Sequence, residues 1–282
     1  MFEKVYIISL AEKKARQAMV QMELTRVGLK DYSFFNAVNG RDPDKQDLIR
    51  RLGLIEKESL PFFSPGHLGC LASHYFLWLQ IYLSSPQDSW YLILEDDCRF
   101  HPSIQPDTLQ EIWSDLPADA VFAKLHSSNG YKDDTALFSE PATTHWLKAR
   151  HLTFSLMAYA VHTRAIKTLL TTVWKNHIDL FHLEGTYIAK RRGSYDLYWS
   201  DLYTSDGFFS QGICIPNNDT DSDTLTETSL PTRSSTLPLK QLMDGHTFKE
   251  GDMSIHLYDE VRPTGTCHVM FAYNQKQFTY TD

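Results

Sequence analysis

Three consecutive acidic residues, Glu95, Asp96 and Asp97, directly follow the apolar run 90–94. Such a run is typical of a buried strand, so the acids are expected at its carboxyl end, where open α/β sheets bind their ligands. Crowded carboxylates repel one another, and their burial needs a cation or a hydrogen-bond donor to offset it. The motif therefore predicts a site for a hard divalent ion, Mn²⁺ or Mg²⁺, that could bridge to a diphosphate. The alternative is a solvated strand end whose carboxylates cap the next helix.

A second set of candidate ligands, His67, Cys70 and His74, occurs at a helical spacing that places the three side chains near one helix face. A zinc site is one interpretation, but no fourth ligand follows at a recognisable spacing. The alternative is a buried cysteine beside hydrogen-bonded histidines, in a helix that packs closely on the sheet or on a ligand. The small residues that indicate close packing are Gly69, Ala72 and Ser73.

The elements that must position these residues alternate between strand and helix patterns. Apolar and β-branched runs predict strands near residues 5–8, 32–38, 90–94, 120–123 and 154–161. Helical periodicity predicts helices near residues 15–22, 68–83, 112–116 and 166–174. This alternation predicts an α/β fold in which a mostly parallel central sheet lies between two helix layers, a Rossmann-type arrangement.

Length and composition restrict the class of protein. The chain has 282 residues, which fits one large or two modest domains, and its net charge of −8 argues against a nucleic-acid partner. Four scattered cysteines, no signal-peptide pattern and no apolar run long enough to span a bilayer favour a cytoplasmic protein. The basic cluster Lys190–Arg192 is expected to be a solvated face; the alternative is contact with an anionic acceptor or with a membrane surface.

Several enzyme classes are disfavoured because their motifs do not occur in the sequence. These motifs are the glycine-rich loops of Walker-type nucleotide hydrolases and dinucleotide oxidoreductases, the serine nucleophile elbow and the His-Glu-x-x-His zinc motif. Residues 217–237 are rich in Thr, Ser, Asp and Pro, which predicts a mobile surface loop. We therefore expect a catalytic domain over residues 1–215, a polar loop over 216–238, and a segment over 239–282 that completes the same domain.

Four sequence blocks occur in one order: 5–10 with Arg16 and Met19, 35–40, 66–74 with Trp78, and 92–97. This ordered set resembles glycosyltransferase family 25, the lipooligosaccharide and collagen galactosyltransferase family. Beyond the first hundred residues, 158–161 with 169–170 and 208–211 are similar to family segments. The resemblance implies a GT-A-like fold, a divalent ion, a UDP-hexose donor with UDP-galactose first, and an oligosaccharide or glycolipid acceptor such as a lipooligosaccharide core.

The resemblance also implies roles for individual residues. The donor-binding residues would be Ile8, Ser9, Leu10, Arg16, Asn39, Gly40, Ser73, His74 and Asp96. The metal would be held by Glu95 and Asp97, with His246 or His256 completing its shell. The sequence departs from the family pattern at Ser9, where Asn is frequent, and at Asn39, where Asp is usual. An insertion-like region over 190–203 leaves the acceptor unspecified.

The implied reaction is an inverting displacement at the anomeric carbon, with a carboxylate that accepts the proton of the attacking hydroxyl. Asp97 would act at the metal, and Asp196 is our first choice for the base because it lies among aromatic residues that could stack on a sugar. Asp179 and Asp201 are rivals, and all three could instead be surface acids. Two other classes stay open: a carbohydrate-binding protein without turnover, and a metal-dependent nucleotidyltransferase that releases pyrophosphate.

Overall fold

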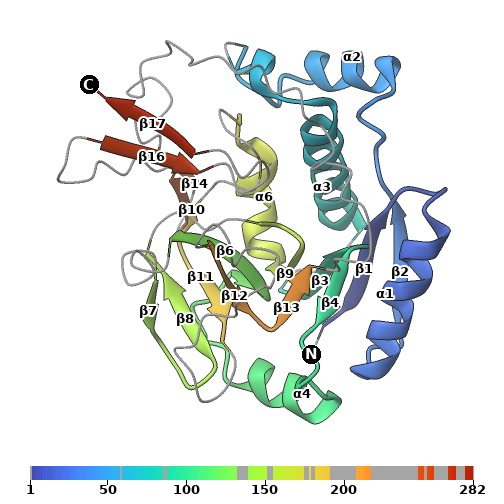
Figure 1. Ribbon diagram of the computed structural model, residues 1–282, viewed down its shortest axis with the longest axis vertical. Coiled ribbons are helices and arrows are strands. Elements are labelled where there is room, and N and C mark those ends of the chain that lie inside the picture. The colour runs from blue at the N-terminus through green and yellow to red at the C-terminus, as the bar shows by residue number, and fades with distance from the viewer. Residues whose placement is uncertain are drawn as a thin grey trace.

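The computed structural model describes residues 2–57, 59–84, 88–131, 139–150, 155–174, 178, 182–190, 208–216, 247–250, 253–256, 266–270 and 277–281. Its centre is an eight-stranded sheet with the strand order β2-β1-β3-β9-β5-β11-β8-β7 (Figure 1). The strands are β1 (Lys4–Ser9), β2 (Tyr32–Asn36), β3 (Trp90–Glu95), β5 (Phe122–Lys124), β7 (Ser139–Pro141), β8 (Trp146–Ala149), β9 (Ala158–His162) and β11 (Thr186–Ala189).

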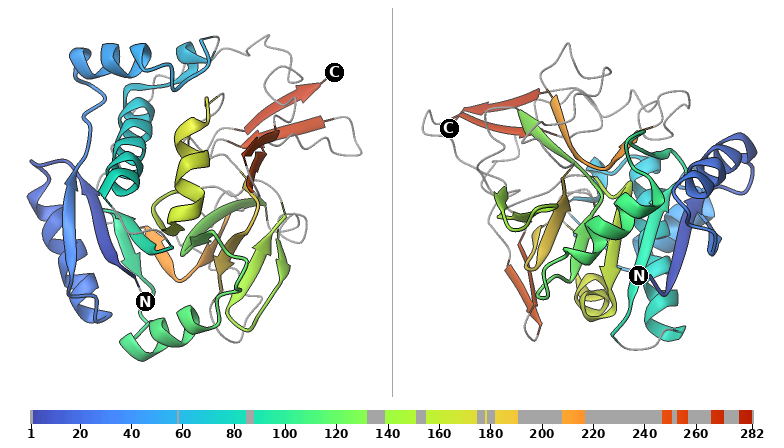
Figure 2. Two further views of the ribbon diagram at one scale, coloured as in Figure 1. Left: turned by 180° about the vertical axis from the view of Figure 1, so that it is seen from behind. Right: turned by 90° about the horizontal axis from the view of Figure 1, so that it is seen from below.

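Helices cover both faces of this sheet (Figures 1 and 2). They are α1 (Lys14–Arg26), α2 (Pro43–Arg51), α3 (Pro65–Ser84), α4 (Pro106–Ser114) and α6 (Thr163–Thr171), with a short 3-10 helix at Leu60–Phe62. Successive side chains of a strand point to opposite faces, and β3 follows this rule. Tyr91 and Ile93 pack in the core with α2, α3 and α6, whereas Leu92 and Leu94 pack in the core with α1 and α4. The expected three-layer α/β fold is therefore confirmed.

The directions of two interior strands differ from the simplest parallel arrangement. Six of the eight strands share one direction, as expected, but β9 and β8 run against them, so four of the seven neighbouring pairs are antiparallel. A parallel connection needs a crossover, usually a helix. Between β5 and β9 the described chain instead forms the strands β6, β7 and β8, and β9 enters the sheet from the opposite end.

Short strand pairs surround the main sheet. They are β4 (Cys98–Phe100) with β13 (Cys214–Pro216), β6 (His126–Tyr131) with β12 (Phe208–Gly212), β15 (Met253–His256) with both β10 (His182–Leu183) and β14 (Thr247–Glu250), and β16 (Thr266–Met270) with β17 (Gln277–Thr281). The predicted loop 216–238 lies outside the described residues except for Pro216. Within the described part of the chain, no helix is both long and apolar enough to cross a bilayer.

Candidate functional site

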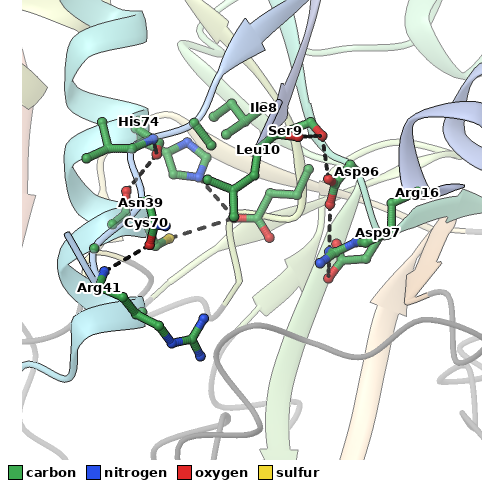
Figure 3. A pocket seen from close by; sticks show the side chains of 17 residues that line it. Ile8, Ser9, Leu10, Arg16, Asn39, Arg41, Cys70, His74, Asp96 and Asp97 are labelled. Carbon is green, nitrogen blue, oxygen red and sulfur yellow. Dashed lines mark hydrogen bonds and ion pairs between the residues drawn. The ribbon is translucent and has the colours of Figure 1, made fainter. Parts of the chain in front are cut away.

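A pocket opens where β1 and β3 end, beside the first turns of α3 (Figure 3). Its lining includes every residue between positions 8 and 97 to which the family resemblance assigned a donor-binding or metal-binding role: Ile8, Ser9, Leu10, Arg16, Asn39, Gly40, Ser73, His74, Glu95, Asp96 and Asp97. The parallel register explains this meeting, because Ile8 pairs with Glu95 and the residues after them leave the sheet at the same edge.

Of the remaining predicted site residues, His256 belongs to the part of the chain that the structure describes. Asp196, its rivals Asp179 and Asp201, and His246 lie outside the described residues. His256 ends strand β15, which pairs with β10 and β14, and it does not line the pocket.

One wall of the pocket, which we call the charged wall, consists of Ser9, Arg16, Asp96 and Asp97. Both oxygens of Asp96 are engaged: Oδ2 accepts a hydrogen bond from Ser9 Oγ at 2.6 Å, and Oδ1 lies 2.6 Å from Arg16 Nη2. The same Arg16 nitrogen lies 3.1 Å from Asp97 Oδ2. Arg16 therefore supplies part of the positive charge that the acidic motif needs, and Asp96 serves to hold β1 and α1 to the end of β3.

Asp97 remains the electrostatically least satisfied member of this wall. Its Oδ1 atom is buried and has no hydrogen-bond partner among the described residues. Burial and then the nearby charge of Glu95 raise the pKa of Asp97 from 3.8 to about 7, although Arg16 acts in the opposite direction. A cation beside this oxygen would offset both effects.

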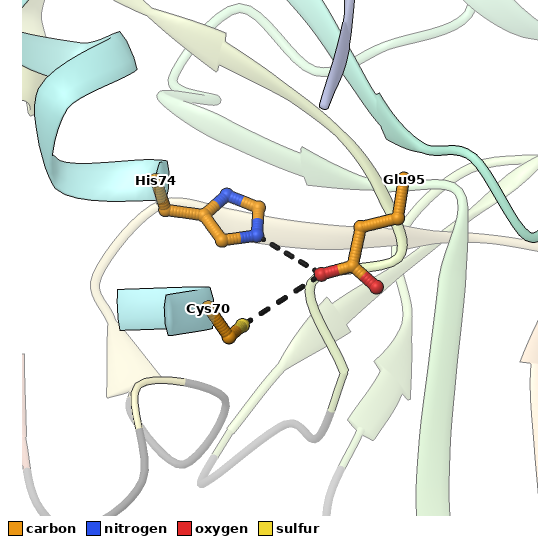
Figure 4. A group of neighbouring side chains, drawn as sticks. All are labelled: Cys70, His74 and Glu95. Atoms are coloured by element: carbon orange, nitrogen blue, oxygen red, sulfur yellow. Dashed lines mark hydrogen bonds and ion pairs between the residues drawn. The ribbon is translucent and has the colours of Figure 1, made fainter. Parts of the chain in front are cut away.

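The opposite wall, which we call the α3 wall, consists of Cys70 and His74 with the carboxylate that they contact, Glu95 (Figure 4). His74 Nε2 lies 3.1 Å from Glu95 Oε1, and Cys70 Sγ lies 3.7 Å from the same oxygen. Figure 4 shows the second carboxylate oxygen, Oε2, pointing away from both donors. Glu95 Oε2 takes part in neither of these two contacts, and Asp97 Oδ1 has no hydrogen-bond partner among the described residues.

The zinc set suggested by the sequence does not form as such. Among the described residues, the group whose ligand atoms lie within 4.8 Å of one another is Cys70, His74 and Glu95, and His67 does not belong to it. Cys70 and His74, one helical turn apart, contact Glu95 at the end of β3, whereas His67, one turn earlier in α3, is outside the pocket lining.

Close backbone contact holds the turn after β2 against α3. A Cβ atom on Gly69 would lie 2.6 Å from the Val38 carbonyl oxygen, and one on Gly40 would lie 1.7 Å from the Pro65 carbonyl oxygen. The hydroxyl of Ser73 accepts from Val38 N–H at 2.8 Å and donates to the Gly69 carbonyl at 2.6 Å. The expected close packing of the small residues in α3 is confirmed, and the Ser73 hydroxyl fastens the turn that carries Asn39.

The sequence did not indicate which hydrogen bonds and ion pairs the side chains of the pocket make with one another. Tyr159 on β9 contacts His74, and Arg16 is bound to the acidic motif itself, although 80 residues separate Arg16 from Asp96. A signal for Tyr159 existed: a tyrosine in an otherwise apolar, fully buried strand needs a partner for its hydroxyl.

Known proteins resemble parts of this chain. The family model described as "Glycosyltransferase family 25 (LPS biosynthesis protein)" matches residues 2–180. A glycosyltransferase-named protein of Acanthamoeba polyphaga mimivirus is 26% identical over 127 residues, which is 45% of this chain and 38% of that protein. A glycosyltransferase 25 family member of Aedes aegypti is 31% identical over 107 residues, 35% of this chain and 16% of that protein. The matches thus span well under half of these relatives.

Solved structures give weaker similarity. A glycosyltransferase involved in the glycosylation of the major capsid of PBCV-1 aligns with a TM-score of 0.31 and 10% identity, over 59% of this chain and 62% of that chain. Mouse xyloside xylosyltransferase 1 aligns with a TM-score of 0.31 and 14% identity, over 60% and 56%. The match of the family model covers well over half of the sequence and all of the described pocket. The chain belongs to glycosyltransferase family 25.

Proposed function

We propose that this protein is a metal-dependent glycosyltransferase that moves a hexose from a UDP-sugar to a saccharide acceptor with inversion. The observation that carries the proposal is the buried Asp97 Oδ1, which has no hydrogen-bond partner among the described residues, in a pocket that Asp97 lines together with Glu95 and Asp96. A nucleotide sugar brings a diphosphate, and a diphosphate beside these acids requires positive charge.

The pocket residues fit a hard divalent ion. Glu95 and Asp97 offer oxygen atoms, the ligand type that Mn²⁺ and Mg²⁺ prefer, and Asp97 Oδ1 is buried with no hydrogen-bond partner in the part of the chain that the structure describes. Arg16 offsets only part of the charge of the three acids. Bound there, the ion would supply charge stabilisation for the departing diphosphate. The other walls of the pocket, around Leu10, Asn39 and Gly40, are the candidate contacts of the nucleotide.

The proposed reaction breaks the bond between the anomeric carbon and the diphosphate oxygen and forms a bond to the acceptor oxygen. UDP leaves with the bonding electrons, and a carboxylate takes the proton of the acceptor hydroxyl. Asp196 is the proposed base and lies outside the described residues. Galactose as the sugar and a lipooligosaccharide core as the acceptor are proposals that derive from the family.

The test is turnover with UDP-galactose and UDP-glucose, measured as UDP released in the presence of Mn²⁺. Replacing Asp97 by Asn should lower the rate by more than about a hundredfold, because it removes a charged group at the reacting diphosphate. Chelation by EDTA followed by dialysis should abolish turnover, and added Mn²⁺ should restore it. Calorimetry should show tighter Mn²⁺-dependent binding of UDP than of GDP or CMP.

The matched control is Asp47→Asn, which removes an exposed carboxylate on α2 that pairs with Arg51. Its turnover should equal that of the wild type. Undiminished turnover in EDTA would refute metal dependence, and pyrophosphate released from a nucleoside triphosphate would identify a nucleotidyltransferase instead.

A further inference from the structure

A hydrogen-bond chain of three buried side chains runs from the interior of the α3 layer to the part-exposed Glu95 of the acidic motif. Trp78 Nε1 donates to the Tyr159 hydroxyl at 2.9 Å, this hydroxyl lies 2.8 Å from His74 Nδ1, and His74 Nε2 lies 3.1 Å from Glu95 Oε1. Trp78, Tyr159 and His74 are each 0% exposed. This hydrogen-bond chain therefore connects α3, β9 and the end of β3, and Glu95 is its first member that contacts solvent.

The chemistry of the first member gives the chain a direction. The indole nitrogen of Trp78 can only donate, so the Tyr159 oxygen must accept from it. The hydroxyl hydrogen of Tyr159 can then be donated to His74 Nδ1, which acts as an acceptor in this arrangement. A neutral imidazole that accepts at Nδ1 carries its hydrogen on Nε2, and this hydrogen is directed at Glu95.

The surroundings hold the central tyrosine in place. Its ring stacks on Phe122 of β5 with the centroids 4.7 Å apart and the planes 14° apart. The hydroxyl position is therefore set by the core of the sheet and not by the pocket. Glu95, in contrast, is at the pocket surface, and a carboxylate there has several rotamers unless a partner selects one.

We propose that Trp78, Tyr159 and His74 form a positioning relay that fixes His74 in its Nε2–H tautomer and holds Glu95 with Oε2 directed into the pocket. In this role His74 and Tyr159 are positioning residues: they act on the ligand of the pocket through Glu95. The relay also disfavours a transition metal at Cys70, His74 and Glu95, because such an ion would have to displace the hydrogen on Nε2.

The test by turnover rests on the proposed function, whereas the test by NMR of the His74 ring does not. The direct measurement is nitrogen-15 NMR of histidine-labelled protein, in which protonated and unprotonated ring nitrogens have distinct shifts. The chain has 12 histidines, and the spectrum of His74→Gln assigns the signals of His74 by their loss. We expect a protonated Nε2 and an unprotonated Nδ1 in the wild type, and loss of this single tautomer in Tyr159→Phe.

The kinetic measurement uses the same substitution, since Tyr159→Phe keeps the ring and its packing and removes the hydroxyl. We expect turnover to fall about 10- to 100-fold, as for other groups that orient a ligand from behind. His74→Gln places an amide donor where Nε2 was and should retain more activity than His74→Leu. The matched control is Tyr187→Phe, which removes a buried hydroxyl on β11 that donates to Asp119, and should leave turnover at the wild-type rate.

The outcomes separate the relay from the proposed function. A His74 signal that is doubly protonated, or protonated at Nδ1, in the wild type overturns the relay whether or not the protein transfers sugar. Wild-type turnover and wild-type Mn²⁺-dependent UDP affinity in Tyr159→Phe also overturn it. If the wild type transfers no sugar, the proposed function fails, and the NMR result alone decides the relay.

Discussion

The two walls of the pocket hold neighbouring carboxylates by different physical means. On the charged wall, Arg16 binds Asp96 and Asp97, and a guanidinium is always charged. On the α3 wall, Glu95 accepts from a thiol and an imidazole, neither of which must carry a charge. The comparison teaches that consecutive residues can have separate roles: Asp96 is ion-paired with Arg16 and structural, whereas Glu95 is oriented by Cys70 and His74.

The largest expected effect comes from removing the cation of the charged wall. Arg16→Met removes the guanidinium that pairs with Asp96 and Asp97, at a site where Arg16 is 9% exposed. Breaking such a buried pair costs about 3–5 kcal/mol of unfolding free energy, because the uncompensated charges stay buried. Urea denaturation of the wild type and the variant at pH 8 in EDTA measures this loss of unfolding free energy.

The control for that substitution is Arg51→Met, whose pair with Asp47 has side chains 71% and 63% exposed. It should cost no more than about 1 kcal/mol. If the two arginine variants lose the same stability, the charged wall is not held together by charge, and the contrast between the walls fails.

The second prediction concerns the pH dependence of stability in the absence of divalent ions. Burial and the charge of Glu95 raise the pKa of Asp97 to about 7 in the folded chain, from the ordinary value of 3.8 that applies in the unfolded chain. Between these values the folded state binds the additional proton, so the contribution of Asp97 is fully present below pH 3.8 and is lost as pH rises through 7. The fall in the free energy of unfolding with rising pH should disappear in Asp97→Asn and become weaker when Mn²⁺ is added. An unchanged slope in Asp97→Asn would assign the titration to another group.

A smaller effect is expected where the α3 wall meets the turn after β2. Gly69→Ala places a Cβ atom 2.6 Å from the Val38 carbonyl oxygen, so the turn must move. We expect a loss of about 1–3 kcal/mol, typical of overpacking. Helix propensity alone predicts the opposite sign, a gain of up to about 1 kcal/mol. The sign of the change in thermal unfolding therefore decides whether close contact or propensity dominates at this position.

The smallest effect is expected at Cys70. A thiol is a weak donor, and its 3.7 Å contact with Glu95 Oε1 accompanies the shorter contact from His74. Cys70→Ala should change the free energy of unfolding by less than about 1 kcal/mol and leave turnover close to that of the wild type. A loss of turnover as large as that of His74→Leu would show that the thiol, and not the imidazole, orients Glu95.

Local sequence patterns predicted some elements of the fold and of the site but not others. The run 90–94 predicted β3, and the acids after it predicted a polar site at the edge of the sheet; both follow from the change from apolar to charged residues along one strand. The reversed direction of β9 was not predicted, because an apolar run reads the same whichever way the strand enters the sheet. His67 was grouped with Cys70 and His74 because spacing alone cannot tell which turns of a helix face a pocket.

The sequence by itself determined which residues could bind a metal or a ligand and which could pack closely. These are the three acids at the end of a strand, a cysteine and a histidine one helical turn apart, and small residues in the same helix. These are local facts, set by residue type and by the periods of strand and helix. Only the tertiary structure determined which of these side chains contact one another. Ser9 and Asp96 are 87 residues apart, and Trp78 and Tyr159 are 81 residues apart. Such contacts depend on strand order and direction, which place β1 and β9 on either side of β3. For that reason the division between an ion-paired Asp96 and an oriented Glu95 is a property of the fold.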